Sequence, residues 1–378
     1  MTLSAAILLC GLVQGPVTVF SGNYVSKCRL TISNAQIIGK VDTQSAGALL
    51  QFPLPDGIKI RQVYINNALQ TPAKYPNGGF IYPPYNVGNG LLWHVREHPW
   101  KISEAIDGIG ITVTKDTGAY FTGQEWMLDN PGEWFQDGNI LKLRADRSGK
   151  IEIVPEGPCL SIYSQQNVTV DNVNFDKCDI AIKTLNSTNV TIRNVNITNV
   201  FSGIVGWNQQ NGSTLIEKTN ISNAEKDGIL FWGESGLIAK KNVISNIGLS
   251  KSWHRSFGAI GGSGAIRIEK NKIRNVAYTG ISQINTNDVI INKNKLSNVC
   301  LRFGDCGGIY VVHSQHAQIY DNKLNHGSGS LQGLRDGWHF GVGIYYDESS
   351  HDGHAWNNTI SDFDWATFAH NSDNVLFE

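Results

Sequence analysis

Polar and titratable side chains gather in the second half of the chain, in a pattern typical of acid–base chemistry. Carboxylates stand beside short apolar runs, and histidines and arginines stand in the segments between them. The set comprises Asp227, Glu234, His254, Arg255, Asp305, His313, Arg335, Asp336, His339, Asp347 and Glu348. Two carboxyl groups, one protonated and one ionised, cleave a glycosidic bond when they lie about 5–5.5 Å apart (retention) or about 6.5–9.5 Å apart (inversion). Hydrolysis of a carbohydrate is therefore one chemistry that these residues fit.

The same residues also fit a second chemistry, β-elimination from a uronate-containing glycan. That reaction needs a cation to neutralise the uronate carboxylate and a base to take the C5 proton. Arg255 or Arg335 can supply the charge, and His254, His313 or His339 can supply the base. Ca²⁺ bound by Asp and Glu at strand edges is a further source of positive charge.

A repeating fold must position these side chains. Two consecutive segments align without gaps, so that Asn172 falls on Asn194 and Asn174 on Asn196, a period of 194 − 172 = 22 residues. A fixed period in this range marks a repeat architecture. The repeats are rich in Val, Ile, Thr and Asn and alternate with period two, as strands do. We predict an all-β, right-handed parallel β-helix with about 22 residues per coil. The alternative is a β-sandwich, although sandwiches do not repeat their sequence.

One strand of each coil follows a Gly-Ile pair, and aligning the isoleucines predicts which side chains face outward. The aligned residues are Ile204, Ile229, Ile281, Ile309 and Ile344. Alternate side chains of a strand face opposite sides. If the isoleucines point inward, two outer rows result: Val205, Leu230, Ser282, Tyr310 and Tyr345 in one, and Trp207, Trp232, Ile284, Val312 and Asp347 in the other.

Trp207 and Trp232 are then neighbours one coil apart, at roughly 4.8 Å. Flat exposed rings suit the faces of sugars, although a module that precedes the coils can also cover them. The predicted substrate-binding residues are Trp207, Trp232, Glu234, His254, Arg255, Tyr310, His313, His339 and Tyr345.

The repeat is interrupted before residue 156, which predicts three regions. Residues 1–50 form N-terminal coils, 51–155 an inserted β-rich module, and 156–378 the main β-helix. Within the module we expect a turn at Asn66-Asn67 and a hairpin at Asp137-Gly138-Asn139. Insertions at 249–264, 300–306 and 326–340 precede Gly-Ile strands and should project from one side of the solenoid, where they build a binding face.

Composition narrows the function classes. The net charge of −1 shows no excess of basic residues of the kind that favours binding to nucleic acid. The apolar N-terminal stretch is too short to span a membrane. None of the six cysteines has metal-site spacing. Cys159 with Cys178, nearly one coil apart, and Cys300 with Cys306, across a short loop, can form disulfides or remain buried thiols.

Several segments resemble bacterial right-handed β-helix carbohydrate-active enzymes. DCGGIY (305–310) and GIYYDESS (343–350) are similar to paired motifs of that group, and EWMLDNPGEWFQDGNILKL (125–143) and QVYINNALQTPAKYPNGGF (62–80) are similar to its inserted module. The chain most resembles glycoside hydrolases of the family-141 type, within the pectin-lyase-like superfamily. The resemblance implies two catalytic carboxylates, Asp305 and Asp347, with Glu348 as an adjacent substitute.

Two features depart from the motif. Cys306 stands where the group usually has Gly. Asp305 also aligns with Phe340, seven residues before Asp347, which is roughly 23 Å along straight strands. The loop 300–306 must fold back if the two carboxylates are to meet. Asp305 can alternatively cap the turn before Gly307.

The sequence thus supports three hypotheses. The first is a secreted, periplasmic or cell-surface glycoside hydrolase that uses Asp347 with Asp305 or Glu348 and needs no cofactor. The second is a polysaccharide lyase. The third is a glycan-binding tailspike or adhesin without turnover. A carbohydrate is the expected partner in all three.

Overall fold

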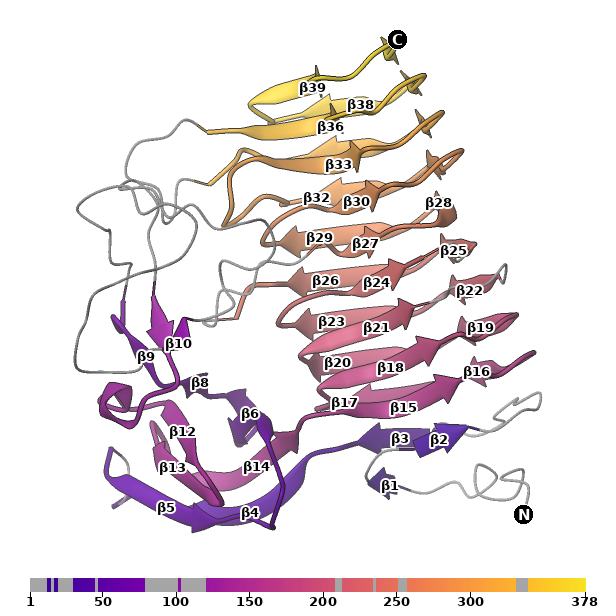
Figure 1. Cartoon of the computed structure of the whole chain (residues 1–378). Helices are drawn as coiled ribbons and strands as arrows, with labels where there is room; N and C mark the ends of the chain where they lie inside the picture. Colours follow the sequence, from indigo (N-terminus) through magenta and orange to yellow (C-terminus); the bar gives the residue numbers. More distant parts are fainter. Residues whose placement is uncertain are drawn as a thin grey trace.

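The computed structural model is a parallel β-helix whose three sheets enclose one core, with a separate β module near the N-terminal end (Figure 1). The structure describes residues 12–14, 17–19, 30–44, 47–78, 101–102, 120–207, 213–233, 236–250, 257–330 and 339–378. From residue 158 onward the chain passes through the sheets in a constant order, which we number sheet I, sheet II and sheet III. The predicted solenoid is confirmed.

Each solenoid sheet contains one strand from each successive coil. Sheet I comprises β2 (Val17–Val19), β15 (Pro158–Tyr163), β18 (Ile180–Leu185), β21 (Ser202–Trp207), β24 (Ile229–Trp232), β27 (Ile260–Gly262), β30 (Ile281–Ile284), β33 (Cys306–Val312), β36 (Gly341–Asp347) and β39 (Trp365–Ala369). Sheet II comprises β16 (Thr169–Asp171), β19 (Val190–Arg193), β22 (Thr214–Glu217), β25 (Leu237–Lys240), β28 (Ala265–Glu269), β31 (Ile290–Asn292), β34 (Gln318–Tyr320), β37 (His354–Trp356) and β40 (Leu376–Phe377). Sheet III comprises β1 (Leu12–Gln14), β3 (Leu30–Ser33), β17 (Val173–Asp176), β20 (Asn196–Val200), β23 (Asn220–Ala224), β26 (Val243–Ile247), β29 (Lys272–Val276), β32 (Lys295–Ser297), β35 (Lys323–Asn325) and β38 (Thr359–Ser361).

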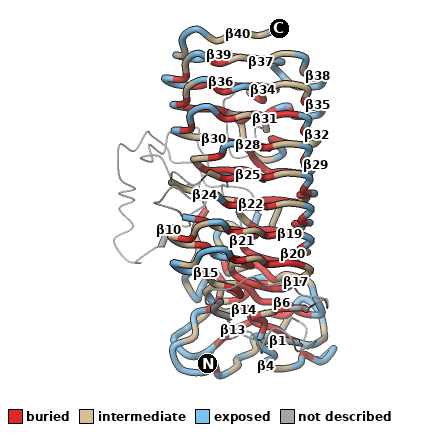
Figure 2. Tube along the Cα trace, turned by 90° about the vertical axis from the view of Figure 1, so that its right-hand side faces the viewer, coloured by how far each residue is buried: buried red, intermediate tan, exposed pale blue. Residues whose placement is uncertain are grey.

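The strands of sheet I pair in parallel with their isoleucines in register. The paired ladder consists of Ile204, Ile229, Ile260, Ile281, Ile309 and Ile344, all completely buried. The alignment made from the sequence is confirmed, with one correction. Residues 249–264 are not all insertion, because β27 lies within them and adds a coil through Ile260. Figure 2 shows buried residues recurring from coil to coil inside the solenoid.

A ladder of buried asparagines holds the corner between sheets II and III. Asn242, Asn271, Asn294 and Asn322 are fully buried, and each Nδ2 donates to Oδ1 of the asparagine in the next coil at 3.0 Å, ending on Asn358. The same oxygens accept the backbone N–H groups of the preceding asparagines. A buried amide without a partner costs about 1–3 kcal/mol, so the ladder favours this register.

The module lies between β3 of sheet III and β15 of sheet I, at the corner that also carries the later insertions. Two of its sheets have four strands each: β4 (Gln36–Val41), β14 (Gly149–Pro155), β6 (Ile60–Ile65) and β7 (Ala68–Leu69) in one, and β5 (Leu49–Pro53), β13 (Ile140–Arg144), β12 (Glu133–Asp137) and β8 (Thr71–Pro72) in the other. A third sheet joins β9 (Lys74–Tyr75), β11 (Phe121–Thr122) and β10 (Lys101–Ile102), and a 3-10 turn, η3, spans Glu125–Met127.

The module's turns follow from local sequence. Asn66 and Asn67 both have positive φ and join β6 to β7, and Gly138-Asn139 joins the hairpin of β12 and β13; both turns were expected. Because β4 pairs with β14, the module begins at Gln36 rather than at the residue 51 expected from the sequence. β4 and β5 read as ordinary alternating strands, and only their pairing reveals their sheet.

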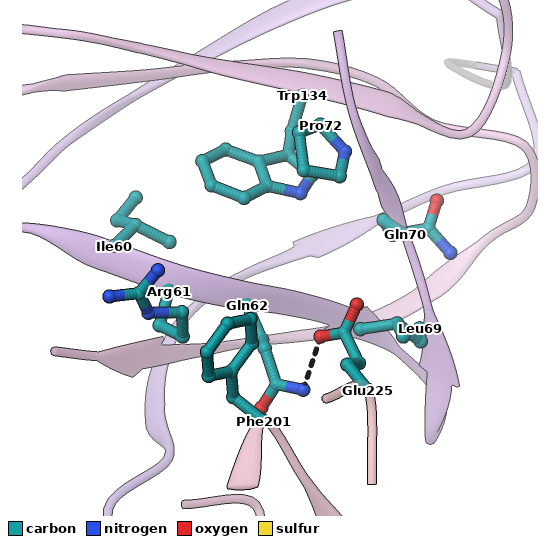
Figure 3. A pocket seen from close by; sticks show the side chains of 9 residues that line it. All are labelled: Ile60, Arg61, Gln62, Leu69, Gln70, Pro72, Trp134, Phe201 and Glu225. Atoms are coloured by element: carbon teal, nitrogen blue, oxygen red, sulfur yellow. Dashed lines mark hydrogen bonds between the residues drawn. The ribbon is translucent and has the colours of Figure 1, made fainter. Parts of the chain in front are cut away.

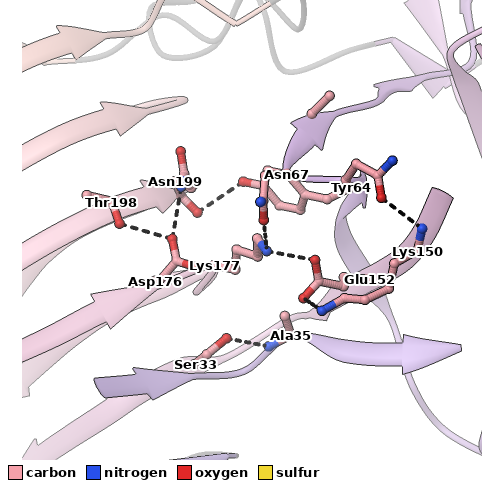
Figure 4. A network of polar contacts seen from close by, with 12 residues as sticks. Ser33, Ala35, Tyr64, Asn67, Lys150, Glu152, Asp176, Lys177, Thr198 and Asn199 are labelled. Carbon is pink, nitrogen blue, oxygen red and sulfur yellow. Dashed lines mark hydrogen bonds and ion pairs between the residues drawn. The ribbon is translucent and has the colours of Figure 1, made fainter. Parts of the chain in front are cut away.

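A buried ion pair joins the module to the solenoid (Figure 4). Lys177 Nζ lies 2.7 Å from Glu152 Oε2, with side chains only 6% and 10% exposed, and Tyr64 donates its hydroxyl to the carbonyl of Asn199. Burial alone would raise the pKa of Glu152, but the ammonium groups of Lys177 and Lys150 outweigh it and lower that pKa. The pair therefore requires both partners to remain charged.

Strand β6 also contacts corners of successive coils. Arg61 lies 3.0 Å from Asp179 and over the ring of Phe201, and Gln62 donates to Glu225 at 2.6 Å. Figure 3 shows Arg61, Gln62, Phe201 and Glu225 among the side chains that line a small cavity between module and solenoid. The volume of this cavity is about 140 Å³. The module is thus attached along the solenoid axis through several polar contacts.

Replacing Lys177 should destabilise the protein strongly. Lys177→Ala removes the closest partner of the buried Glu152 carboxylate and leaves Lys150, 3.0 Å away, as its remaining cation, which costs about 1.5–3 kcal/mol, the usual contribution of a hydrogen bond to a charged group. Lys241→Ala is the matched control, because Lys241 also has positive φ but is exposed, and we expect a change below about 0.5 kcal/mol. Denaturant unfolding measures both.

The difference between the two lysine variants should depend on pH. Because the folded pKa of Glu152 is depressed, its stabilisation is present above the unfolded pKa and is lost as pH falls through the folded value. Equal unfolding free energies for both variants at neutral pH would contradict the role assigned to the ion pair.

Candidate active site

Asp347 ends strand β36 and is the centre of a hydrogen-bonded cluster on the outer face of sheet I. Tyr310 Oη donates to Asp347 Oδ2 at 2.7 Å, and the N–H of Glu348 donates to Oδ1 at 2.9 Å. His370 Nδ1 lies 2.8 Å from the same Oδ1. The residue is only 8% exposed. Three successive coils therefore fix the orientation of one carboxylate.

The register explains how these residues meet. Tyr310 pairs with Tyr345, and Val312 pairs with Asp347, so Tyr310 is the diagonal neighbour of Asp347 on the same face. Tyr346 pairs with Ala369, which places His370 beside Asp347 in the next coil.

Two tyrosines accompany the carboxylate. Burial raises the pKa of Tyr310 and of Tyr345 far above the usual value, and the nearby negative charges of Asp347 and Asp305 raise both further. Both phenols therefore stay protonated at neutral pH and act as hydrogen-bond donors. The rings lie edge to face at 5.1 Å, and Phe340 and Phe368 pack on Tyr345 to form an aromatic wall.

Asp305 belongs to a loop closed by a disulfide. Cys300 and Cys306 are bonded, with their Cα atoms 5.9 Å apart, and the Asp305 carbonyl accepts a hydrogen bond from Tyr278 Oη at 2.8 Å. Asp305 has positive φ and is exposed. Cys306 pairs with Gly341, so Asp305 aligns with Phe340, as expected. Its negative charge contributes to the raised pKa of Tyr310 and Tyr345.

Exposed polar residues surround this centre. Glu348 and His313 lie in adjoining coils, where the N–H of His313 donates to the Glu348 carbonyl at 2.9 Å, and both are exposed. His339 is exposed as well, next to Phe340 of the aromatic wall. Glu234, His254, Arg255, Arg335 and Asp336 lie outside the described residues.

The two predicted tryptophans, Trp207 and Trp232, lie in the same outer row as Asp347. Trp207 pairs with Trp232 and is 51% exposed, so the described part of the module leaves its ring accessible. Trp232 meets the ring of Phe257 edge-on at 4.8 Å. Trp232 is four coils from Asp347, about 19 Å along the axis at ~4.8 Å per coil.

The sequence reasoning missed two residues of this row. His370 was overlooked because its coil has Thr367 in place of the aligned isoleucine; aligning ATFAH (366–370) with GIYYD (343–347) would have found it. Tyr163 was overlooked because its strand lacks the Gly-Ile signal, yet it precedes Leu185 and Trp207 in the row and is 56% exposed.

Asp227, one of the polar residues singled out in the sequence, holds a loop and does not face the outer surface of sheet I. It is completely buried at the corner between sheets III and I, where its Oδ1 accepts the N–H of Phe257 at 2.8 Å, and burial raises its pKa to about 6. Asp364 accepts the N–H groups of Gly329 and Gly341 in the same way. These carboxylates anchor the inserted loops.

Within the described ranges, no group of three or more His, Cys, Asp or Glu side chains is arranged to hold a metal ion. The same ranges contain no helix with the length and apolar character needed to cross a membrane.

Comparison with known proteins identifies the architecture. The family model described as "Right handed beta helix region" matches residues 158–324 and 202–378, together more than half of the chain. No curated protein sequence matches. A solved structure titled "Glycoside hydrolase" aligns with a TM-score of 0.57 and 12% identity over 95% of this chain and 89% of that chain.

Weaker structural likenesses complete the comparison. DFA-IIIase from Arthrobacter chlorophenolicus A6 gives a TM-score of 0.44 with 13% identity over 56% of this chain and 50% of that chain. An alginate lyase from Paenibacillus sp. str. FPU-7 gives 0.37 with 14% identity over 58% and 76%. With 12% sequence identity, the alignment to the structure titled "Glycoside hydrolase" establishes a shared fold and nothing about activity.

The Tyr310 hydroxyl should stabilise the folded protein. Tyr310→Phe removes a donor to the buried Asp347 carboxylate, and hydrogen bonds to charged groups contribute about 1.5–3 kcal/mol. Tyr163→Phe, at an exposed position of the same sheet, should change the free energy of unfolding by less than about 0.5 kcal/mol. Equal values for the two variants in urea unfolding would rule out the Tyr310–Asp347 bond.

Proposed function

The chain belongs to the right-handed β-helix family, and from that premise we propose that it is a glycoside hydrolase whose active site lies on the outer face of sheet I. The observation that carries the proposal is the Asp347 carboxylate, which is held by Tyr310, His370 and the Glu348 N–H. It stands in one outer row with the exposed ring of Trp207. A fixed carboxylate beside a row of flat rings suits a carbohydrate chain.

Asp347 serves as the ionised member of the carboxylate pair. Tyr310 remains protonated because burial raises its pKa, so its hydroxyl donates a hydrogen bond to Asp347 Oδ2. Asp347 then either attacks the anomeric carbon or takes a proton from the water that attacks it.

Asp305 is proposed as the acid that protonates the departing glycosidic oxygen. Its negative charge, like that of Asp347, contributes to the raised pKa of Tyr310 and Tyr345, and its loop directly precedes β33, the strand that carries Tyr310. The Cys300–Cys306 disulfide restricts the loop that carries it. Glu348, exposed and next in sequence to Asp347, is the second candidate for the acid.

The aromatic row is proposed as the binding platform for a polysaccharide. Tyr163 and Trp207 are exposed, and with Trp232 they extend the Asp347 row toward the N-terminal coils. A polymer that lies along this row contacts several coils at once, whereas a disaccharide cannot reach from Asp347 to Trp232. Oligosaccharides of increasing length should therefore bind with increasing affinity.

The cellular location is proposed from the cysteines. Cys159–Cys178 and Cys300–Cys306 are both disulfides, in agreement with one of the two alternatives considered from the sequence. Disulfides persist mainly in oxidising compartments. A secreted, periplasmic or cell-surface protein with access to polysaccharides is consistent with these bonds.

Three carboxylate variants test the proposal. Asp347→Asn and Asp305→Asn should each lower the release of reducing ends from a responsive polysaccharide by about 10²–10⁴-fold, the usual contribution of acid–base groups. Glu348→Gln should retain more activity than Asp305→Asn if Asp305 is the acid. Glu217→Gln, on sheet II, serves as the control and should leave the rate unchanged.

The ranking of the variants decides the assignment. Full activity in Asp347→Asn would contradict the proposed site. A large loss in Glu348→Gln together with full activity in Asp305→Asn would transfer the acid role to Glu348.

A further inference from the structure

A second concave feature lies at the corner between sheets I and II, away from the Asp347 cluster. It is a pocket of about 430 Å³ bordered by residues of three successive coils, among them Gly233, Ser263, Ile266, Asn285 and Asn287. This volume falls within the range of about 300–1,000 Å³ typical of small-molecule sites.

A shortened corner creates the pocket. Only residues 263–264 connect β27 to β28, whereas residues 233–236 connect β24 to β25 and 285–289 connect β30 to β31. The short connection requires glycine: Gly262 and Gly264 have φ of +112° and +73°, and a Cβ on Gly262 would clash with the Phe231 carbonyl oxygen. The connection of the middle coil is therefore two to three residues shorter than those of its neighbours, and the pocket lies at this corner.

A β-bulge places an apolar side chain at this recess. Leu237 pairs with Ala265 and Ile238 with Arg267, so Ile266 is the extra, unpaired residue. Bulges redirect side chains that would otherwise follow the alternation of the strand. Ile266 is 49% exposed, unlike the fully buried Ile268 of the same strand, and lines the pocket.

The rest of the lining is neutral and polar. Ser263 Oγ accepts the N–H of Gly233 at 2.9 Å, and Asn287 Oδ1 accepts the N–H of Gln315 at 3.1 Å, which orients that amide. Asn285 is exposed. Among the described residues that line the pocket, none carries a charge. Amides and hydroxyls around an exposed aliphatic group match the hydroxyls and C–H groups of an uncharged sugar, whereas none of the described lining residues offers a cation to a carboxylate.

The pocket adjoins the proposed platform. Gly233 directly follows Trp232, and Asn285 directly follows Ile284, which lies in the Asp347 row two coils away, about 10 Å along the axis at ~4.8 Å per coil. A glycan that spans Trp232 and Asp347 therefore passes the edge of the pocket.

We propose that this pocket is a subsite for an uncharged monosaccharide unit that branches from the glycan bound on sheet I. This proposal rests on the proposed function, because the sugar unit belongs to the glycan that the active site on sheet I would bind. It specifies the substrate further: a polysaccharide with neutral side units should be preferred over its unbranched backbone.

Methyl NMR on the full chain tests the subsite directly. The protein is labelled with ¹³C at isoleucine δ1-methyl groups and titrated with xylose, glucose, galactose, fucose and glucuronate. The Ile266 resonance is identified by its absence from Ile266→Val. At least one neutral sugar should shift this resonance saturably, while glucuronate should not, and the methyl of Ile37, an isoleucine of the module that is 60% exposed, should not move.

A variant sharpens the test. Asn285 has positive φ, so Asn285→Gly keeps the backbone unstrained, and the loss of one hydrogen bond should weaken sugar binding by about three- to ten-fold. Equal shifts of Ile266 and Ile37, a response to glucuronate as large as to neutral sugars, or no response to any sugar would overturn the proposal. No turnover is measured, so a failed hydrolysis assay and a failed subsite are distinguishable.

Discussion

In-register stacking of parallel strands is the constraint on which the rest of the structure depends. The buried amides of Asn242, Asn271, Asn294 and Asn322 hydrogen-bond from coil to coil, and the isoleucines of sheet I pair in the same register. A slip of one residue would exchange the inner and outer faces of a strand. Because the register is fixed, an outer row can bring side chains from distant parts of the sequence into one line, and the Asp347 cluster assembles in this way from three coils.

The successive coils differ in length mainly at the corners between sheets. The corner between sheets III and I is lengthened four times, by the module and by the loops before β27, β33 and β36. The carboxylates of Asp227, which is buried, and Asp364, which is exposed, hold these loops through backbone N–H groups. The corner between sheets I and II is shortened once, at Ser263-Gly264, and there a pocket appears. The stacked sheets keep the same register throughout, and insertions or deletions at the corners determine the shape of the surface beside them.

Much of this architecture could be predicted from the sequence, since periodicity reports directly on stacked strands. The Gly-Ile alignment gave the correct partners for Tyr310, Tyr345 and Asp347. It failed where a coil departs from the consensus: Ile260 was hidden in a glycine-rich segment, and His370 follows a threonine instead of the aligned isoleucine. The approach of the Asp305 charge to Tyr310 depends on how a disulfide-closed loop folds, and the recess beside Ile266 depends on the length of one corner relative to its neighbours. Such three-dimensional relations leave no periodic signal.

The most direct test of hydrolysis on sheet I measures two products of the same reaction. Wild-type protein is incubated with a panel of neutral and acidic polysaccharides, and reducing ends are recorded together with the near-ultraviolet absorbance of unsaturated sugars. Our account predicts that reducing ends rise on at least one polysaccharide without any absorbance. A parallel rise of both signals would contradict it and identify β-elimination, and binding without either signal would identify a solenoid that only holds its glycan.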